Sequence, residues 1–168
     1  ETFGRPSSKL LVILHGGPGS DYKYLLNCKA FANEGYYVVF YDQRGSGLSM
    51  RHSINTYSIQ LMIDDLDAVI THYKTADTQK VFLLGHSWGA MLATGYINKY
   101  PNAVNGAILA EPGGFNWQEV KDYGEKSRRL KLFSEATNDA VYIDQFLSGN
   151  EDDHAIIDYK MGLASPYT

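Results

Sequence analysis

The sequence is poor in cysteine, in basic charge and in long apolar segments, and each shortage narrows the class of protein. Its one cysteine, Cys28, excludes an internal disulfide and a cysteine-based metal site, and is expected to act as a small core hydrophobe. A net charge of −4 without any basic run argues against a nucleic-acid or anionic-membrane partner. No apolar run reaches the ~18 residues of a membrane span. With no visible leader and a single thiol, the default expectation is a cytoplasmic globular protein.

What the sequence does contain is a series of short apolar runs that alternate with helical patterns. Buried strands are expected at residues 9–14, 36–41, 80–84 and 103–110. Three helices are expected between them. The first begins with a cap at Ser20 or Asp21 and stops at Gly35, and the third covers residues 88–100. The second begins with a cap at Thr56 and continues to Tyr73, with the acids at 64, 65 and 67 facing away from its apolar stripe.

This alternation of strands and helices predicts an α/β fold with a mostly parallel sheet flanked by helices. In such sheets ligands bind beyond the carboxyl ends of the strands. Three of the four expected strands run directly into glycine-rich turns at that end, at residues 15–19, 42–49 and 85–89. We therefore expect the chemistry in these turns, within a core domain of residues 1–111. Residues 112–168 read as the first part of a helical cap.

The turn after the third expected strand carries the strongest chemical signal. The run GHSWG at residues 85–89 matches G-x-S-x-G and lies between a buried strand and a helix, which is the context that gives the motif its meaning. A nucleophile on so sharp a turn has strained backbone angles, so its neighbours Gly85 and Gly89 must lack side chains. The helix N-terminus also favours developing negative charge. Ser87 is therefore predicted to be the nucleophile of a serine hydrolase.

The run HGGPG at residues 15–19 ends the first expected strand. A tetrahedral oxyanion needs two backbone N–H donors directed at one point, and glycine allows the close approach. We predict the amides of Gly17 and Trp88 as these donors. His15 precedes the nucleophile in the chain, so it is interpreted as a structural histidine that braces the loop.

The run DQRGSGLS at residues 42–49 closes the second expected strand. Asp42 and Arg44 are interpreted as holding this turn. The loop lacks a third matching glycine and a following Lys-Ser/Thr, so nucleotide binding is unsupported.

Together HGGPG, DQRGSGLS and GHSWG resemble the α/β-hydrolase superfamily, and more narrowly the proline iminopeptidases of peptidase family S33. The resemblance covers residues 9–111, with Ala90 in place of the glycine usual in the family. It implies an α/β-hydrolase fold that removes an N-terminal residue, often proline, from small peptides, amides or esters without metal or cofactor. The family generally recognises the substrate's free amine through carboxylates of its cap, which have no residue-by-residue match here. Glu111, just past the fourth expected strand, is the candidate for this role, and a solvated or structural glutamate is the alternative.

The partners of Ser87 are not evident in the sequence. A hydrolase of this kind needs Ser, then an acid, then His along the chain. The only histidine after Ser87 is His154, in a charged stretch that reads as a cap helix. We therefore expect the triad His and Asp beyond Thr168, in an incomplete domain whose C-terminal half lies in a second chain or in residues absent from this one. Two alternatives stay open: an esterase, lipase or carbon–carbon hydrolase, and a non-catalytic ligand-binding member of the fold.

Overall fold

A computed structural model describes residues 1–113, 118 and 122, which include the whole predicted core. The chain divides into two units, residues Glu1–Gly113 and Gly114–Thr168. The predicted helical cap domain, residues 112–168, therefore lies almost wholly outside the described residues, and so does His154. The elements are the strands β1 (Thr2–Phe3), β2 (Lys9–Leu14), β3 (Tyr36–Phe40), β4 (Val81–His86) and β5 (Gly106–Ala110), the 3-10 helices η1 (Lys23–Glu34) and η2 (Ile54–Thr56), and the α-helices α1 (Ile59–Tyr73) and α2 (Trp88–Lys99).

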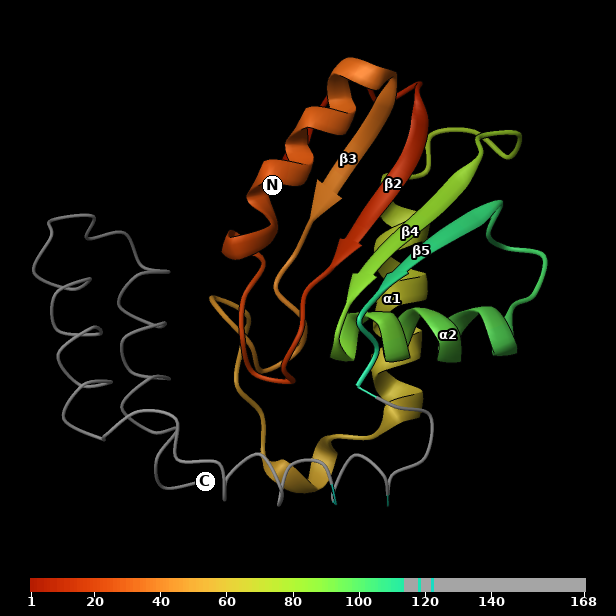
Figure 1. The fold of residues 1–168 in the computed structure, drawn as a ribbon. Coiled ribbons are helices and arrows are strands. Elements are labelled where there is room, and N and C mark those ends of the chain that lie inside the picture. The colour runs from red at the N-terminus through yellow and green to blue at the C-terminus, as the bar shows by residue number, and fades with distance from the viewer. Residues whose placement is uncertain (114–117, 119–121, 123–168) are drawn as a thin grey trace, which may run out of the picture. The chain divides into compact units, whose positions relative to one another are not determined.

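The five strands form one sheet in the order β1-β3-β2-β4-β5 (Figure 1). Four of them, β3, β2, β4 and β5, run parallel to one another, which confirms the predicted mostly parallel sheet. The remaining strand, β1, pairs antiparallel with β3 through Thr2 and Phe3. It is absent from the predicted strands because two residues are too few to show a period.

Helices cover both faces of the central strands, which explains their continuous apolar runs. The expected burial is wrong for β5, which lies at the edge of the sheet and has Ile108 and Leu109 53% and 40% exposed. Along β2, Leu10, Val12 and Leu14 pack on the face that carries α1 and α2. Leu11 and Ile13 pack on the opposite face, against residues of η1. Figure 1 shows the orange η1 on one side of the strands and the two α-helices on the other. Each of these five side chains is at most 4% exposed, so each contributes about 1.5–3 kcal/mol of hydrophobic stabilisation.

The segment before β3 is helical as predicted, but it is a 3-10 helix and it begins differently. Its N-cap is Tyr22, which makes no side-chain capping bond. The Asp21 carboxylate instead accepts the amide of Lys23 at 2.9 Å, just inside the helix. Gly35 ends the helix with φ 80°, a left-handed conformation that favours glycine and confirms the predicted stop.

The predicted cap of α1 at Thr56 is wrong, and the cap is Ser58. Its hydroxyl oxygen accepts the amide of Leu61 at 3.1 Å. Thr56 belongs to the preceding turn, where its hydroxyl donates to the carbonyl of Ser53 at 2.7 Å. Thr56 and Ser58 lie two positions apart, and both residue types favour the N-cap position, so the sequence alone does not distinguish them. No helix in the described part of the chain is long and apolar enough to cross a membrane.

Candidate active site

Ser87 occupies a strained turn between β4 and α2. Its φ of 53° and ψ of −120° lie outside the regions that a side-chain-bearing residue normally adopts, at a cost of order 1–3 kcal/mol. Surrounding hydrogen bonds hold this conformation. The Ser87 amide donates to the carbonyl of Ala110 at 2.9 Å, and the Ser87 carbonyl accepts the amides of Ala90 and Met91 at 3.0 and 3.2 Å. The predicted nucleophile therefore lies on the strand-turn-helix geometry that the motif requires.

The glycines on either side of Ser87 are sterically required. A Cβ on Gly89 would collide with the carbonyl oxygen of Leu14, at the end of β2. A Cβ on Gly85 would collide with the carbonyl of Gly89 across the turn. The steric reason given for the two glycines is thus confirmed. Ala90 is fully buried, so its methyl group fits where the helix starts.

His15 braces the loop after β2 from inside. It is fully buried, and its Nε2 accepts the amide of Gln43 at 3.0 Å. Its Nδ1 must then carry the proton, and it donates to the carbonyl of Gly16 at 2.8 Å. The carbonyl of Gly16 and the N–H of Gly17 belong to one planar trans peptide and point in opposite directions. By fixing the carbonyl, His15 fixes the direction of the Gly17 N–H.

Gln43 joins all three motifs, a role that the sequence analysis missed. Its side chain is buried and donates through Nε2 to the carbonyl of His15 at 2.8 Å. Its Oε1 accepts the indole N–H of Trp88 at 2.9 Å. An uncharged amide can donate and accept at once, which a carboxylate cannot. The only feature of the sequence that could have indicated this role is the position of Gln43, a side-chain amide just beyond the end of an apolar strand.

The two predicted oxyanion donors lie on loops that meet at Ser87. β2 and β4 are neighbours in the sheet, with Leu14 opposite Gly85, so both loops leave the same edge. A Cβ placed on Gly16 would lie 3.2 Å from the Cβ of Ser87. Trp88 is the first residue of α2, so its amide has no partner within the helix. The arrangement can place two backbone donors beside a serine hydroxyl.

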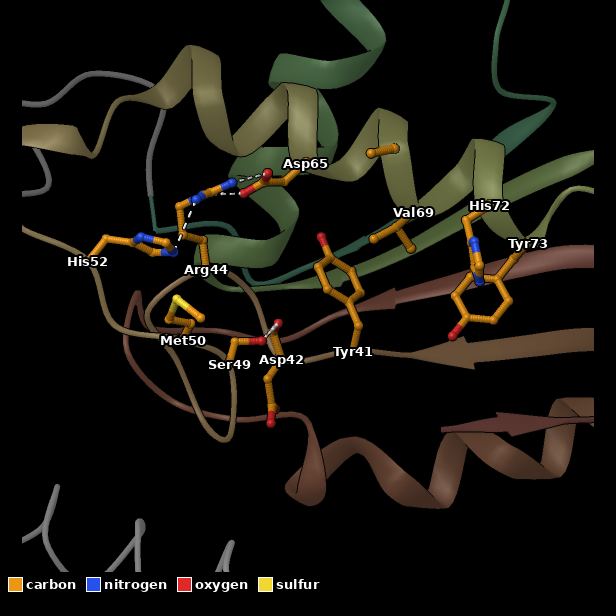
Figure 2. A pocket seen from close by; sticks show the side chains of 11 residues that line it. Tyr41, Asp42, Arg44, Ser49, Met50, His52, Asp65, Val69, His72 and Tyr73 are labelled. Atoms are coloured by element: carbon orange, nitrogen blue, oxygen red, sulfur yellow. Dashed lines mark hydrogen bonds and ion pairs between the residues drawn. The ribbon is translucent and has the colours of Figure 1, made fainter.

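The loop at residues 42–49, which follows β3 and is called the third loop here, is held by its charged residues, as predicted. The Asp42 carboxylate accepts the amides of Leu48 at 2.9 Å and Tyr22 at 3.3 Å. Arg44 makes a two-pronged ion pair with Asp65 on α1, at 2.6 Å from Nε and 2.5 Å from Nη2 (Figure 2). This pair raises the pKa of the Arg44 guanidinium.

The spacing of the acids on α1 predicted that they face away from the apolar stripe, but two of them bond to other parts of the protein. Asp65 is half-buried against Arg44, and Asp67 accepts the hydroxyl of Tyr96 at 2.8 Å. Beside the ion pair lies a cavity of about 580 Å³, between the third loop and α1 (Figure 2). Ser87 does not line this cavity, so the cavity is separate from the nucleophile elbow.

Glu111 follows β5 directly and is exposed, with φ 47°. Its neighbour Ala110 is the residue whose carbonyl accepts the Ser87 amide, so Glu111 lies at the same sheet edge as the elbow. Within the described residues, no hydrogen bond links the Ser87 hydroxyl to a histidine. His86, next to Ser87, bonds instead through Nδ1 to the hydroxyl of Tyr24 at 2.7 Å. His154 lies outside the described residues.

A mostly parallel sheet, a serine on a strand-turn-helix elbow and a glycine-rich loop after the neighbouring strand define an α/β-hydrolase. A sequence model of the family described as "Serine aminopeptidase, S33" matches residues 5–159. The chain therefore belongs to the S33 serine aminopeptidase family of α/β-hydrolases.

Its relatives include more than one kind of hydrolase. The chain is 38% identical over 100 residues to a proline iminopeptidase of Thermoplasma volcanium, covering 60% of this chain and 33% of the relative. It is 32% identical over 139 residues to a proline iminopeptidase of Clostridium botulinum, covering 80% and 45%. It is also 34% identical over 100 residues to epoxide hydrolase B of Mycobacterium tuberculosis, covering 59% and 27%.

The fold is similar to that of solved hydrolases. The crystal structure of a proline iminopeptidase from Mycobacterium smegmatis matches 94% of this chain and 54% of its own, with a TM-score of 0.62 and 24% identity. The chain spans 33% and 45% of the length of the two proline iminopeptidases of Thermoplasma volcanium and Clostridium botulinum.

Proposed function

We propose that the whole protein is a serine aminopeptidase that releases an N-terminal residue, of the proline type, from small peptides or amides. The observation that carries this proposal is Ser87 in a left-handed turn at the edge where the Gly17 loop and the Trp88 amide meet. Membership of the S33 family and the proline iminopeptidase relatives support the amide substrate.

In the proposed reaction the Ser87 hydroxyl oxygen attacks the scissile carbonyl carbon as a base removes its proton. The carbonyl oxygen becomes an oxyanion that accepts hydrogen bonds from the amides of Gly17 and Trp88. Collapse of this intermediate breaks the C–N bond, and the leaving amine takes up the proton. Water then hydrolyses the acyl ester on Ser87. We assign the histidine base and its aspartate to parts of the whole protein outside these 168 residues.

Glu111 is proposed to recognise the substrate's free amine. An ammonium group is attracted to a carboxylate, and Glu111 is exposed at the edge of the sheet where Ser87 lies. Replacement of Glu111 by Gln should then raise KM for substrates with a free N-terminus and leave N-blocked esters unaffected. An equal effect on both substrates would contradict this role.

The similarity to an epoxide hydrolase raises a second reaction class, but the residue at the elbow disfavours it. Attack of a serine hydroxyl on an epoxide carbon would form an ether. An ether has no carbonyl for water to attack, so an oxyanion site could not release the product. Attack on an acyl group forms an ester that water can hydrolyse. Ser87 at the elbow therefore favours acyl substrates.

The experiment uses the whole protein that carries this sequence. A fluorophosphonate should label Ser87. The enzyme should hydrolyse a proline arylamide, which releases an arylamine, with a higher kcat/KM than a simple aliphatic acyl ester, which releases an alcohol. Ser87→Ala should lose both reactions and remain folded, because a smaller side chain fits the same space. Labelling with a preference for the ester would assign an esterase instead. No labelling of the folded wild-type protein would assign a non-catalytic member and overturn the proposal.

A further inference from the structure

The hydroxyl of Tyr24 links the oxyanion loop to the nucleophile elbow. Tyr24 lies in η1, remote in sequence from the elbow, and its oxygen accepts the amide of Gly16 at 2.6 Å. The same oxygen lies 2.7 Å from Nδ1 of His86, the residue before Ser87. The two rings also meet edge to face, with centroids 5.4 Å apart. One phenol thus holds both of the loops that the proposed reaction needs.

These three parts of the chain converge on one point. A Cβ on Gly16 would lie 3.0 Å from the Tyr24 hydroxyl, 3.2 Å from the Ser87 Cβ and 3.3 Å from the His86 Nδ1. No side chain therefore fits at position 16 without displacing one of them. The close approach allows the phenol to reach the loop amide and the elbow imidazole at once.

The hydrogen-bonding capacity of a phenol suits this bridge. The oxygen can accept two hydrogen bonds and donate one, and the Gly16 amide occupies one acceptor position. Contact with His86 is kept whichever ring nitrogen carries the imidazole proton, because the phenol can either donate or accept. Tyr24 is 48% exposed, and its partial burial raises the pKa of the phenol, so it stays protonated at neutral pH.

Tyr24 completes the restraint that His15 begins. The peptide that joins His15 to Gly16 is fixed at its carbonyl by Gln43 and at its N–H by Tyr24. The next peptide is fixed at its carbonyl by the His15 ring, which leaves the Gly17 N–H directed away from that ring. Without the phenol, the first peptide loses the partner of its N–H, and the Gly17 donor is less firmly placed.

We propose that Tyr24 is a positioning residue of the oxyanion site, which sets the Gly17 donor against the elbow through its bonds to Gly16 and His86. The inference rests on the proposed serine-hydrolase function. It does not depend on the aminopeptidase specificity, because the oxyanion site serves esters and amides alike. The phenol acts on the transition state by placing another group, and it does not itself touch the reacting atoms.

The test compares Tyr24→Phe with Tyr22→Phe in the whole protein. Both changes remove one phenol oxygen, but the Tyr22 hydroxyl donates to the Glu1 carboxylate at 3.1 Å, whereas the Tyr24 hydroxyl accepts the amide of Gly16. The readouts are kcat and KM for a p-nitrophenyl ester and the rate of fluorophosphonate labelling at Ser87. Because a misplaced group about 1 Å from its correct position can cost up to ~100-fold, we expect Tyr24→Phe to lower kcat and the labelling rate about tenfold. KM should change less than twofold, and Tyr22→Phe should match wild type.

A second variant keeps the inference testable if the Tyr24→Phe protein does not fold. His86→Ala removes the other end of the bridge and should lower the labelling rate, and the double variant should be no slower than the slower single variant. Wild-type rates in Tyr24→Phe, additive losses in the double variant, or a raised KM with unchanged kcat would each overturn the inference and leave the serine-hydrolase proposal standing. A wild-type protein that reacts with neither ester nor fluorophosphonate would overturn both.

Discussion

The indole N–H of Trp88 donates a hydrogen bond to the side-chain oxygen of Gln43 at 2.9 Å. Gln43 lies in the loop after β3 and Trp88 is the first residue of α2, 45 positions further along the chain. Gln43 passes the connection on to His15, whose ring fixes the Gly16–Gly17 peptide. The two residues whose amides are the proposed oxyanion donors are therefore linked through the buried side chain of Gln43.

Replacement of Gln43 by Met tests this network, because Met has a similar length and neither donates nor accepts strongly. The buried carbonyl of His15 and the indole of Trp88 would lose their partner. We expect a loss of about 2 kcal/mol in the free energy of unfolding, measured with urea, and slower labelling of Ser87. Gln60→Met is the matched control, since the exposed Gln60 bonds only to Asp64 among the described residues. Equal losses in the two variants would contradict the network.

A larger loss of stability is predicted for a substitution in the nucleophile elbow. Gly89→Ala should destabilise the protein by about 3 kcal/mol or more, because its Cβ would meet the backbone carbonyl of Leu14, which cannot move without disturbing β2. Gly95→Ala, six residues further along α2, is the control. Its Cβ would meet only the tip of Ile63 at 3.3 Å, and alanine favours the helix by about 1 kcal/mol. Thermal unfolding of both variants checks the difference, and similar melting temperatures would refute it.

The features predicted correctly from the sequence are those that neighbouring residues determine. The strands β2, β3 and β4 show as apolar runs, and the elbow shows because Gly85, Ser87 and Gly89 meet a steric demand within five positions. The local rule failed where two similar residues compete for one role, as Thr56 and Ser58 do for the cap of α1.

The missed features are contacts between distant residues. Gln43 reaches Trp88 across 45 positions, and Tyr24 reaches His86 across 62. Asp65 meets Arg44 because α1 lies beside the third loop, which the helical period of α1 cannot reveal. Periodicity tells which face a residue takes, but not which side chain from another loop it will meet there.

Tyr41 gives a prediction about alkaline pH. Its hydroxyl is buried and has no hydrogen-bond partner within the described residues, and burial raises the pKa of the phenol. A raised folded-state pKa contributes stability that is present below the unfolded value of about 10 and is lost as the pH rises further. Tyr41→Phe should be as stable as wild type or up to about 1 kcal/mol more stable at pH 7, because it removes an unpaired buried hydroxyl.

The same variant should lose less stability than wild type above pH 10, since Phe has no proton to release. Urea unfolding at pH 7, 9, 10 and 11 gives the comparison. Tyr22→Phe provides a reference for an exposed hydroxyl bond, although burial also raises the pKa of Tyr22, to about 12. A Tyr41→Phe protein with the full alkaline loss of wild type would show that Tyr41 does not titrate with folding.

The ion pair between Arg44 and Asp65 should contribute more than its nearest counterpart on the same helix. It has two contacts, at 2.6 and 2.5 Å, and its side chains are only 24% and 26% exposed. A double-mutant cycle with Arg44→Gln and Asp65→Asn should give a coupling of about 1 kcal/mol that largely persists in 1 M NaCl. The Lys99–Asp64 pair has one contact at 2.8 Å and is 34% and 48% exposed, so its coupling should be smaller and vanish in salt. Equal salt sensitivity of the two pairs would show that the third loop is not anchored to α1 through Arg44.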